Sequence, residues 1–319
     1  MFCKNERDVY VASCTKNGGI YHYKVCDGKL IFQEVTKMDR PMYMTIDNRK
    51  MYILLRTPFE SQESGVVIYD IDGNGGIINP SPVFSTMGAV ACHILVDRGD
   101  VYCANYISGS VAKLPNKVVQ HFGHGADLNR QEKPHTHFVG MTPDQKYICV
   151  ADLGTDTVVL YNRDLTVHST VSVPSGHGVR HLAFSEDGKW MFSVNELQST
   201  MSAFSYYDGA LVLVDTCSIV PDSFVGESTA AAIRIKDGYV YASNRGHNSI
   251  SKVSFSGERL MLLETIDCRG KAPRDFCFAG DYILCANQDS DRITVLDGKN
   301  GYDLVEQACV EQPICILAV

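Results

Sequence analysis

The sequence predicts an all-β protein, a seven-bladed β-propeller with four-stranded antiparallel blades. A short strand pattern recurs through the chain, and the last apolar run supplies the one strand that the first repeat lacks. The clearest unit runs from Pro134 to Tyr161, where the runs HFVGM, YICVAD and TVVLY are separated by the turn sequences TPDQK and LGTD; a fourth run follows from Thr166 to Val173. Alternating Val, Ile and Tyr favour strands, and Pro-Asp and Gly-Thr-Asp favour tight turns.

The two central strands of this unit recur seven times, beginning at Val9, Met51, Val101, Tyr147, Met191, Val240 and Ile283. Five of the copies carry an Asn or Asp that is followed six residues later by an apolar residue; these anchors are Asn105, Asp152, Asn195, Asn244 and Asn287. Successive anchors lie 47, 43, 49 and 43 residues apart. A period of about 40 to 50 residues with four strands per repeat is typical of a propeller.

The two ends of the chain are expected to meet in one blade. A first strand precedes every copy except the one that starts at Val9, and a run of the missing type, Pro313 to Val319, ends the chain. We therefore expect this run to complete the first blade, because a closed ring leaves no exposed sheet edge. No linker separates two domains, so residues 1–319 are expected to form a single propeller domain.

Composition narrows the classes of partner. The chain has 319 residues, a formal net charge of -8 and 12 cysteines, with no C-x-x-C pair. An anionic surface argues against non-specific binding to nucleic acid or to an anionic membrane. Zinc sites and a disulfide framework are disfavoured, and we see no signal peptide and no membrane span, so a cytoplasmic location is expected. The oligomeric state is left open.

The geometry of a blade predicts which residues lie at the same mouth of the channel. The start of each first strand and the end of each second strand meet at the same mouth of the channel. Aligned starts are Met42, Cys92, His137, Arg180, Ala231 and Arg274, and aligned ends are Tyr106, Leu153, Glu196, Arg245 and Gln288, with Arg56 as an addition. Three longer segments, Thr57 to Gly65, Gln120 to Pro134 and Pro221 to Ser228, have no strand pattern. Long loops of this kind shape the mouth of a propeller channel.

This rim suits the attack of water on an ester-like carbonyl. Glu196 or His137 is a candidate general base, and Arg180 or Arg245 is a candidate for stabilising the oxyanion. A further arginine would bind a phosphate or carboxylate in bidentate fashion. We see no nucleophile elbow around a Ser or Cys, which argues against a covalent route.

Structural roles compete with each of these assignments. Glu196 and Arg180 are also expected to form an ion pair that ties two strands together. His135 and His137, two residues apart on a strand, would share a face, and with His121 and His124 they leave a metal site open, although no carboxylate completes it. Arg274 and Gln288 also fit ordinary polar rim residues.

Several motifs together resemble one family. They are RQEKPHTH from Arg130, VADLGTD from Val150, GVRHLAFSEDGKW from Gly178, VNELQST from Val194 and SNRGHNSI from Ser243, with APRDFCF and ANQDSDRI further on. The chain resembles the lactonase family that contains propeller-type 6-phosphogluconolactonase and 3-carboxy-cis,cis-muconate cyclase. The resemblance covers nearly the whole chain and implies a seven-bladed propeller that needs no metal or other cofactor.

The resemblance also implies a set of site residues. Carried onto this chain, the catalytic set is His135 or His137 with Arg180, Glu196 and Arg245, and Arg130, Arg274 and Gln288 are candidates for binding substrate. The expected activity is hydrolysis of a small anionic lactone, most simply 6-phosphoglucono-1,5-lactone to 6-phosphogluconate. A muconate cycloisomerase-like activity, another sugar lactonase, and a non-catalytic propeller that binds a metabolite or a protein remain alternatives. Ala232 stands where relatives often have an acidic residue, which leaves the substrate open.

Overall fold

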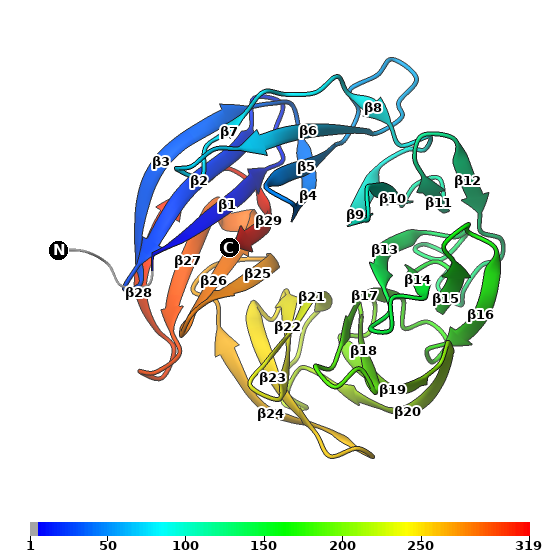
Figure 1. Ribbon diagram of the computed structural model, residues 1–319. Coiled ribbons are helices and arrows are strands. Elements are labelled where there is room, and N and C mark those ends of the chain that lie inside the picture. Colours follow the sequence, from blue (N-terminus) through cyan, green and yellow to red (C-terminus); the bar gives the residue numbers. More distant parts are fainter. Residues whose placement is uncertain (1–5) are drawn as a thin grey trace.

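Seven antiparallel sheets surround a central channel, as predicted; six have four strands, and the sheet of blade 2 has a fifth, short strand (Figure 1). The computed structural model describes residues 6–319. The expectation that the chain starts without a signal peptide concerns in part residues 1–5, which lie outside the described residues. Apart from one 3-10 turn, η1 (Gln288–Ser290), residues 6–319 contain only strands and irregular segments. No helix in this part of the chain is long and apolar enough to cross a membrane.

Blades 1, 2 and 3 run from the innermost to the outermost strand. Blade 1 contains β29 (Pro313–Ala318), β1 (Arg7–Ser13), β2 (Gly19–Cys26) and β3 (Lys29–Lys37). Blade 2 contains β4 (Pro41–Asp47), β5 (Lys50–Leu55), β6 (Gly65–Ile71), and the short strands β7 (Ile77–Ile78) and β8 (Phe84–Ser85), which both pair with β6. Blade 3 contains β9 (Ala91–Asp97), β10 (Asp100–Asn105), β11 (Ser110–Lys113) and β12 (Lys117–Gln120).

Blades 4 to 7 repeat the same order. Blade 4 contains β13 (Thr136–Met141), β14 (Tyr147–Asp152), β15 (Thr157–Asn162) and β16 (Val167–Ser172). Blade 5 contains β17 (Val179–Phe184), β18 (Trp190–Asn195), β19 (Thr200–Tyr207) and β20 (Ala210–Ser218). Blade 6 contains β21 (Thr229–Lys236), β22 (Tyr239–Arg245), β23 (Ser249–Phe255) and β24 (Leu260–Asp267). Blade 7 contains β25 (Pro273–Ala279), β26 (Tyr282–Asn287), β27 (Arg292–Asp297) and β28 (Asp303–Cys309).

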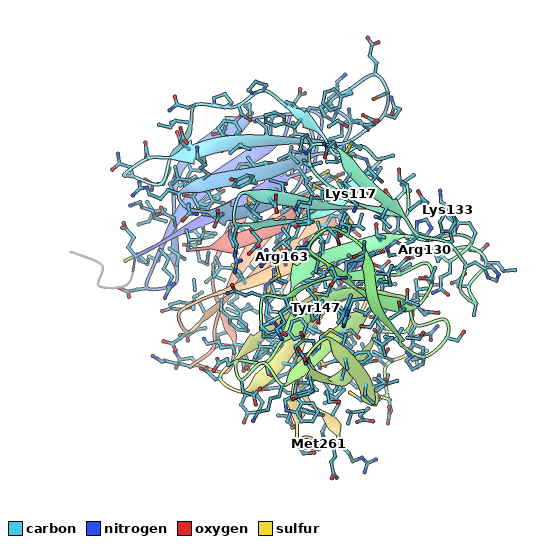
Figure 2. The ribbon with its side chains drawn as sticks, turned by 45° about the vertical axis from the view of Figure 1, so that its right-hand side comes forward. Lys117, Arg130, Lys133, Tyr147, Arg163 and Met261 are labelled. Atoms are coloured by element: carbon cyan, nitrogen blue, oxygen red, sulfur yellow. The ribbon has the colours of Figure 1, made fainter. Side chains whose placement is uncertain are left out.

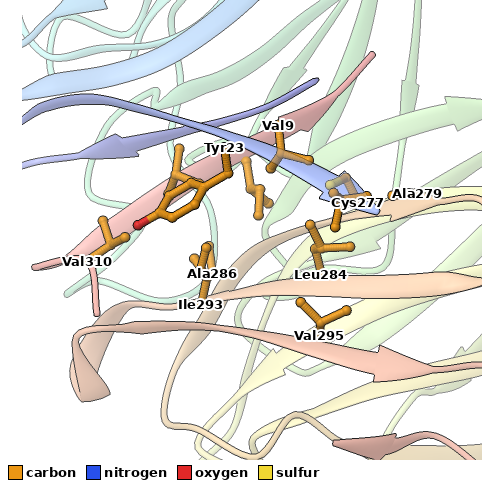
Figure 3. Packing of buried hydrophobic residues seen from close by; sticks show 12 residues of the cluster. Val9, Tyr23, Cys277, Ala279, Leu284, Ala286, Ile293, Val295 and Val310 are labelled. Carbon is orange, nitrogen blue, oxygen red and sulfur yellow. The ribbon is translucent and has the colours of Figure 1, made fainter. Parts of the chain in front are cut away.

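The C-terminal strand closes the ring, as the sequence predicted. Strand β29 pairs antiparallel with β1, with Val9 opposite Ala318 and Ala12 opposite Cys315. Blades 7 and 1 are then joined by a buried cluster that includes Val9, Tyr23, Leu284 and Val295 (Figure 3). Comparable clusters fill each of the other blade interfaces. The core is therefore a ring of interfaces between neighbouring sheets, and each blade depends on its neighbours to bury its faces.

The anchor residues have a structural reason. Each of the five is fully buried and lies at or next to the end of the second strand of its blade. Three of the Asn side chains donate to carbonyl oxygens of the preceding connection, from Asn105 to Thr86 at 3.1 Å, from Asn244 to Ile219 at 3.3 Å and from Asn287 to Cys268 at 3.5 Å. A buried polar group that ties one blade to the connection before it satisfies a backbone acceptor that the sheet leaves unpaired. This explains why the anchor recurs once per repeat.

The innermost strands share a β-bulge near their start. The register with the second strand shifts between Thr136 and Phe138 in β13, between Val179 and His181 in β17, and between Pro273 and Asp275 in β25. The residues inserted at these shifts are His137, Arg180 and Arg274. The same shift occurs in β4, β9, β21 and β29. A bulge re-aims a side chain without ending the strand, so one fold feature directs a residue from each blade toward the channel.

Candidate active site

A cavity of about 290 Å³ lies at one mouth of the channel. It is lined by the aligned strand starts Met42, Cys92, His137 and Arg274 and by the strand ends Arg56, Tyr106, Glu196 and Arg245. Arg130 reaches it from the loop that follows β12, and Figure 2 shows Arg130 and Lys133 at the side of the molecule where this loop runs. Strands from most of the ring therefore contribute to one site.

Among residues 6–319, Glu196 is the only carboxylate that lines this cavity, and three arginines bind it. Its Oε1 accepts a hydrogen bond from Arg130 Nη2 at 2.6 Å. Its Oε2 accepts one from Arg180 Nε at 2.9 Å and lies 3.0 Å from Arg245 Nη2. The Arg180–Glu196 ion pair that the sequence left as an alternative is thus present. Both carboxylate oxygens are occupied, so Glu196 has little capacity left to receive a proton from water.

The charges at this cluster reinforce that conclusion. Burial alone would raise the pKa of the Glu196 carboxyl, but the charges of Arg245, Arg180 and Arg130 outweigh burial and hold its pKa well below the ordinary value. Burial, followed by the charge of Arg245, lowers the pKa of Arg180 to about 9. A carboxylate that remains ionised and fully bonded is a poor general base. Its role is to hold three guanidinium groups in place.

Two of the cavity arginines have no carboxylate partner among the described residues. Arg274 donates only a long hydrogen bond, of 3.5 Å, from Nη1 to Gln288 Oε1. Burial and the nearby charge of Arg245 lower the pKa of Arg274. Arg56 lines the same cavity from blade 2 and has no ion pair. Arg56 follows β5 of blade 2, across the ring from Glu196 in blade 5, whereas Arg274 of blade 7 lies beside Arg245 of blade 6, and these two arginines line a common groove.

Two polar atoms are buried at the cavity without a hydrogen-bond partner, His137 Nδ1 and Arg245 Nε. Burial, together with the charge of Arg180, holds the pKa of His137 well below its ordinary value. The imidazole is therefore neutral near pH 7. Arg245 donates from Nη2 to the Ala230 carbonyl at 3.2 Å, so its other contacts fix the guanidinium while Nε remains available. Unsatisfied buried polar atoms are uncommon and often mark a functional site.

His135 is placed differently from His137. Its Nδ1 lies 3.1 Å from the Tyr106 carbonyl oxygen, its Nε2 lies 3.3 Å from the Glu132 carboxylate, and its ring stacks on Tyr106 at 4.5 Å between centroids. It does not line the cavity. The bulge at His137 breaks the alternation that predicted a shared face for the two rings, so of the pair only His137 reaches the site.

Below the cavity, the channel contains a column of aromatic and imidazole rings. The His181 ring lies 5.3 Å from that of His137 and 5.1 Å from that of His93, and His93 packs against Tyr43 at 4.4 Å. Arg234 and Asp275, 2.7 Å apart, form a separate ion pair in the channel. Within residues 6–319 there is no group of three or more His, Cys, Asp or Glu side chains arranged to hold a metal ion.

The structure brings together most of the residues that the sequence predicted for the site. Arg130, His137, Glu196, Arg245 and Arg274 line one cavity, and Arg180 lies directly beneath them. Gln288 lies beside this cavity, in a groove that it shares with Arg274. Sequence reasoning missed Thr229, because the Pro221 to Ser228 segment hides where the next strand begins, and it gave Arg56 no role, because the blade 2 insertion blurs the repeat there.

Comparison with known proteins decides the family. A family model described as "Lactonase, 7-bladed beta-propeller" matches residues 8–317. The chain belongs to this family. A candidate 6-phosphogluconolactonase of Bacteroides fragilis has a similar structure, with a TM-score of 0.90, 25% identity, and coverage of 100% of this chain and 99% of that one.

Two further similar proteins extend the comparison. The periplasmic gluconolactonase of Pseudomonas aeruginosa has a TM-score of 0.89 at 24% identity, covering 98% of this chain and 99% of that one, which shows the common fold. An uncharacterised Staphylococcus aureus protein is 29% identical, over 91% of this chain and 92% of its own length.

Proposed function

We propose that this lactonase-family propeller hydrolyses an anionic sugar lactone, and that 6-phosphoglucono-1,5-lactone is the substrate that fits best. The observation that carries the proposal is the charge of the cavity. Four arginines, Arg56, Arg130, Arg245 and Arg274, line it against the single carboxylate of Glu196, in a chain whose formal net charge is -8. A cationic cavity in an anionic protein is suited to an anionic ligand.

The ion pairs within the cavity support different roles for its arginines. Arg56 and Arg274, which lack a carboxylate partner, would bind the phosphate, because guanidinium groups match phosphate oxygens in bidentate fashion. The lactone carbonyl would then lie toward blades 4 to 6. There Arg245 Nε, buried without a partner, would donate to the oxygen that becomes negative in the tetrahedral intermediate.

The proton transfers require a group that is neutral near pH 7. His137 meets this condition, since burial and Arg180 lower its pKa and its Nδ1 is unpaired. The lowered pKa also makes the ring a weak base, so it would accept the proton only as the attacking water becomes acidic on bonding to the carbonyl carbon. It would take a proton from water as the oxygen of that water bonds to the carbonyl carbon. When the ring C–O bond breaks, the imidazolium would return this proton to the leaving oxygen. Water and lactone then give one hydroxy acid, with no covalent enzyme intermediate.

A substrate comparison tests the proposal. Initial rates should be measured for 6-phosphoglucono-1,5-lactone and glucono-1,5-lactone, each corrected for hydrolysis in buffer. We expect Arg274→Gln to lower kcat/KM for the phosphorylated lactone about 10- to 100-fold, since a charge-assisted hydrogen bond contributes roughly 1.5–3 kcal/mol. The loss with the unphosphorylated lactone should be much smaller.

A matched control uses an arginine on the exposed surface. Arg259, in the turn before β24, is exposed and has no ion pair among the described residues, so Arg259→Gln should leave both rates unchanged. Equal loss of both activities in Arg274→Gln would contradict a phosphate-binding role. Rates no faster than in buffer for both lactones would reject the proposed activity.

A further inference from the structure

A second and larger hollow opens beside the cavity, between the turn after β18 and the segment that leads into β21. Its volume is about 600 Å³, and it shares the lining residues Arg130 and Thr229 with the cavity, so the two are adjacent. The wall carries Gln198 and Ser199 from blade 5, Asn129 from the loop after β12, and Phe224 and Ser228 from the segment before blade 6. We call this hollow the lateral groove.

The lateral groove opens at the one turn, in blade 5, that lacks a hydrogen bond present at the equivalent turns of blades 4, 6 and 7. Four residues after the anchor, the chain turns with a positive φ in blades 4 to 7, at Asp156 (57°), Ser199 (46°), Asn248 (59°) and Asp291 (52°). In three of these blades the side chain accepts a hydrogen bond from the backbone just before the next innermost strand. Asp156 accepts from Gly178 at 2.6 Å, Asn248 from Ala272 at 2.8 Å, and Asp291 from Gln312 at 2.9 Å.

Blade 5 lacks this bond. Its turn residue is Ser199, which is 2% exposed and whose hydroxyl has no hydrogen-bond partner. The shorter side chain does not join the turn to the segment before β21. The Ser228 hydroxyl, on the other wall of the groove, is also buried without a partner. Two orphaned hydroxyls belong to residues that line one groove, so this wall holds donors and acceptors that the fold itself leaves unsatisfied.

The chemistry of the wall selects the kind of ligand. Asn129 and Gln198 contribute amides, Ser199 and Ser228 contribute hydroxyls, and Phe224 contributes an aromatic ring. Two carboxylates, of Asp127 and Glu227, face the groove, against the one guanidinium of Arg130, which is already paired with Glu196. This balance disfavours a second phosphate. Amides and hydroxyls beside an aromatic ring match a neutral ligand that carries many hydroxyl groups.

We propose that the lateral groove is a carbohydrate subsite, which binds a neutral sugar linked to the lactone ring held in the cavity. This inference rests on the proposed lactone hydrolysis for the position of the lactone, and it adds that the substrate class includes glycosyl-substituted aldonolactones. The groove lies on the side of the cavity away from Arg56, so a phosphate-binding end and a sugar-binding end are compatible with one elongated substrate.

The test compares two unphosphorylated substrates, cellobiono-1,5-lactone and glucono-1,5-lactone. We expect a kcat/KM at least about tenfold higher for the disaccharide lactone, the effect of one or two additional hydrogen bonds. In Ser199→Asn the longer side chain should make the bond that Asn248 makes in blade 6 and narrow the groove. The ratio of the two kcat/KM values should then fall at least about fivefold.

The controls separate this idea from the proposed function. Ser172→Asn makes the same substitution on the exposed edge strand β16, and should leave the ratio unchanged; Gln198→Ala is a second variant within the groove and should lower it. A wild-type ratio near one, or a ratio that neither groove variant changes, would overturn the subsite.

If neither lactone is hydrolysed faster than in buffer, the proposed function fails, and calorimetric titration with cellobiose decides the subsite. Binding that is weakened in Ser199→Asn supports it, and absence of binding rejects it.

Discussion

Three buried imidazoles in the channel should make the stability of this protein depend steeply on pH between neutral and mildly acidic conditions. Burial, followed by the charge of Arg234, lowers the pKa of His93 to about 3. Burial and the charge of Arg180 hold the pKa values of His137 and His181 well below the ordinary value of about 6.5. These rings stay neutral in the folded chain, whereas in the unfolded chain they become protonated as the pH falls through about 6.5.

The sign and the size of the effect follow from this difference. Because the folded pKa is depressed, the unfolded state binds more protons, and stability is complete above about pH 6.5 and is lost as the pH falls toward the folded pKa. Between pH 7 and pH 5 each ring should lower the free energy of unfolding by about 2 kcal/mol, or about 6 kcal/mol for three. That is a large part of the 5–15 kcal/mol that stabilises a typical domain. The arginines around Glu196 hold the pKa of that carboxyl well below this window.

Urea denaturation followed by circular dichroism at pH 7 and pH 5 measures the effect. His93→Phe keeps a ring between Tyr43 and Phe138, which the imidazole contacts at 4.4 Å. We expect this variant to lose only about 4 kcal/mol between the two pH values, because two titrating rings remain. The matched control is His124→Asn, since His124 is exposed. A wild-type loss below about 2 kcal/mol, or an equal loss in His93→Phe, would refute the reasoning.

Two further predictions follow from the ring and from the site. Glu196→Gln leaves three buried or half-buried arginines without their counter-charge, so it should lower the free energy of unfolding by about 3–5 kcal/mol and reduce kcat/KM sharply. Urea denaturation measures the first effect and lactone hydrolysis the second. A variant with wild-type stability would show that the cluster contributes little to the stability of the fold. Deletion of Pro313 to Val319 removes β29 and opens the ring between blades 7 and 1; thermal unfolding should show a cooperative loss of the whole propeller, and a variant that melts at the wild-type temperature would contradict closure by this strand.

Much of the fold could be predicted from the sequence because its stabilising contacts repeat. The anchors Asn105, Asn244 and Asn287 recur at the same place in three blades, since each buries an amide that ties the sheet to the connection before it. The same alignment brought His137, Arg180 and Glu196 to one rim. Period and pattern are properties of the chain, and they predict which residues share a mouth of the channel.

The remaining features of the site depend on distances between side chains, which a pattern of residue types along the sequence does not contain. The bulges that aim His137 and Arg274 into the channel leave no mark in the alternation of apolar residues. Sequence reasoning also left Glu196 as either a base or an ion-pair partner, because the choice depends on how many guanidinium groups reach its two oxygens. Ser199 carries a weak signal, a residue that departs from the Asp or Asn of the neighbouring turns, but its meaning requires the groove.

The most direct test of the account is a crystal structure of the protein with 6-phosphogluconate, the product of the proposed reaction. We expect the phosphate oxygens to lie within hydrogen-bond distance of Arg56 and Arg274, and the carboxylate to lie near Arg245 Nε and His137. Product bound with its phosphate at the Glu196 cluster, in the lateral groove or on the other face of the disc would contradict the assignment of the cavity.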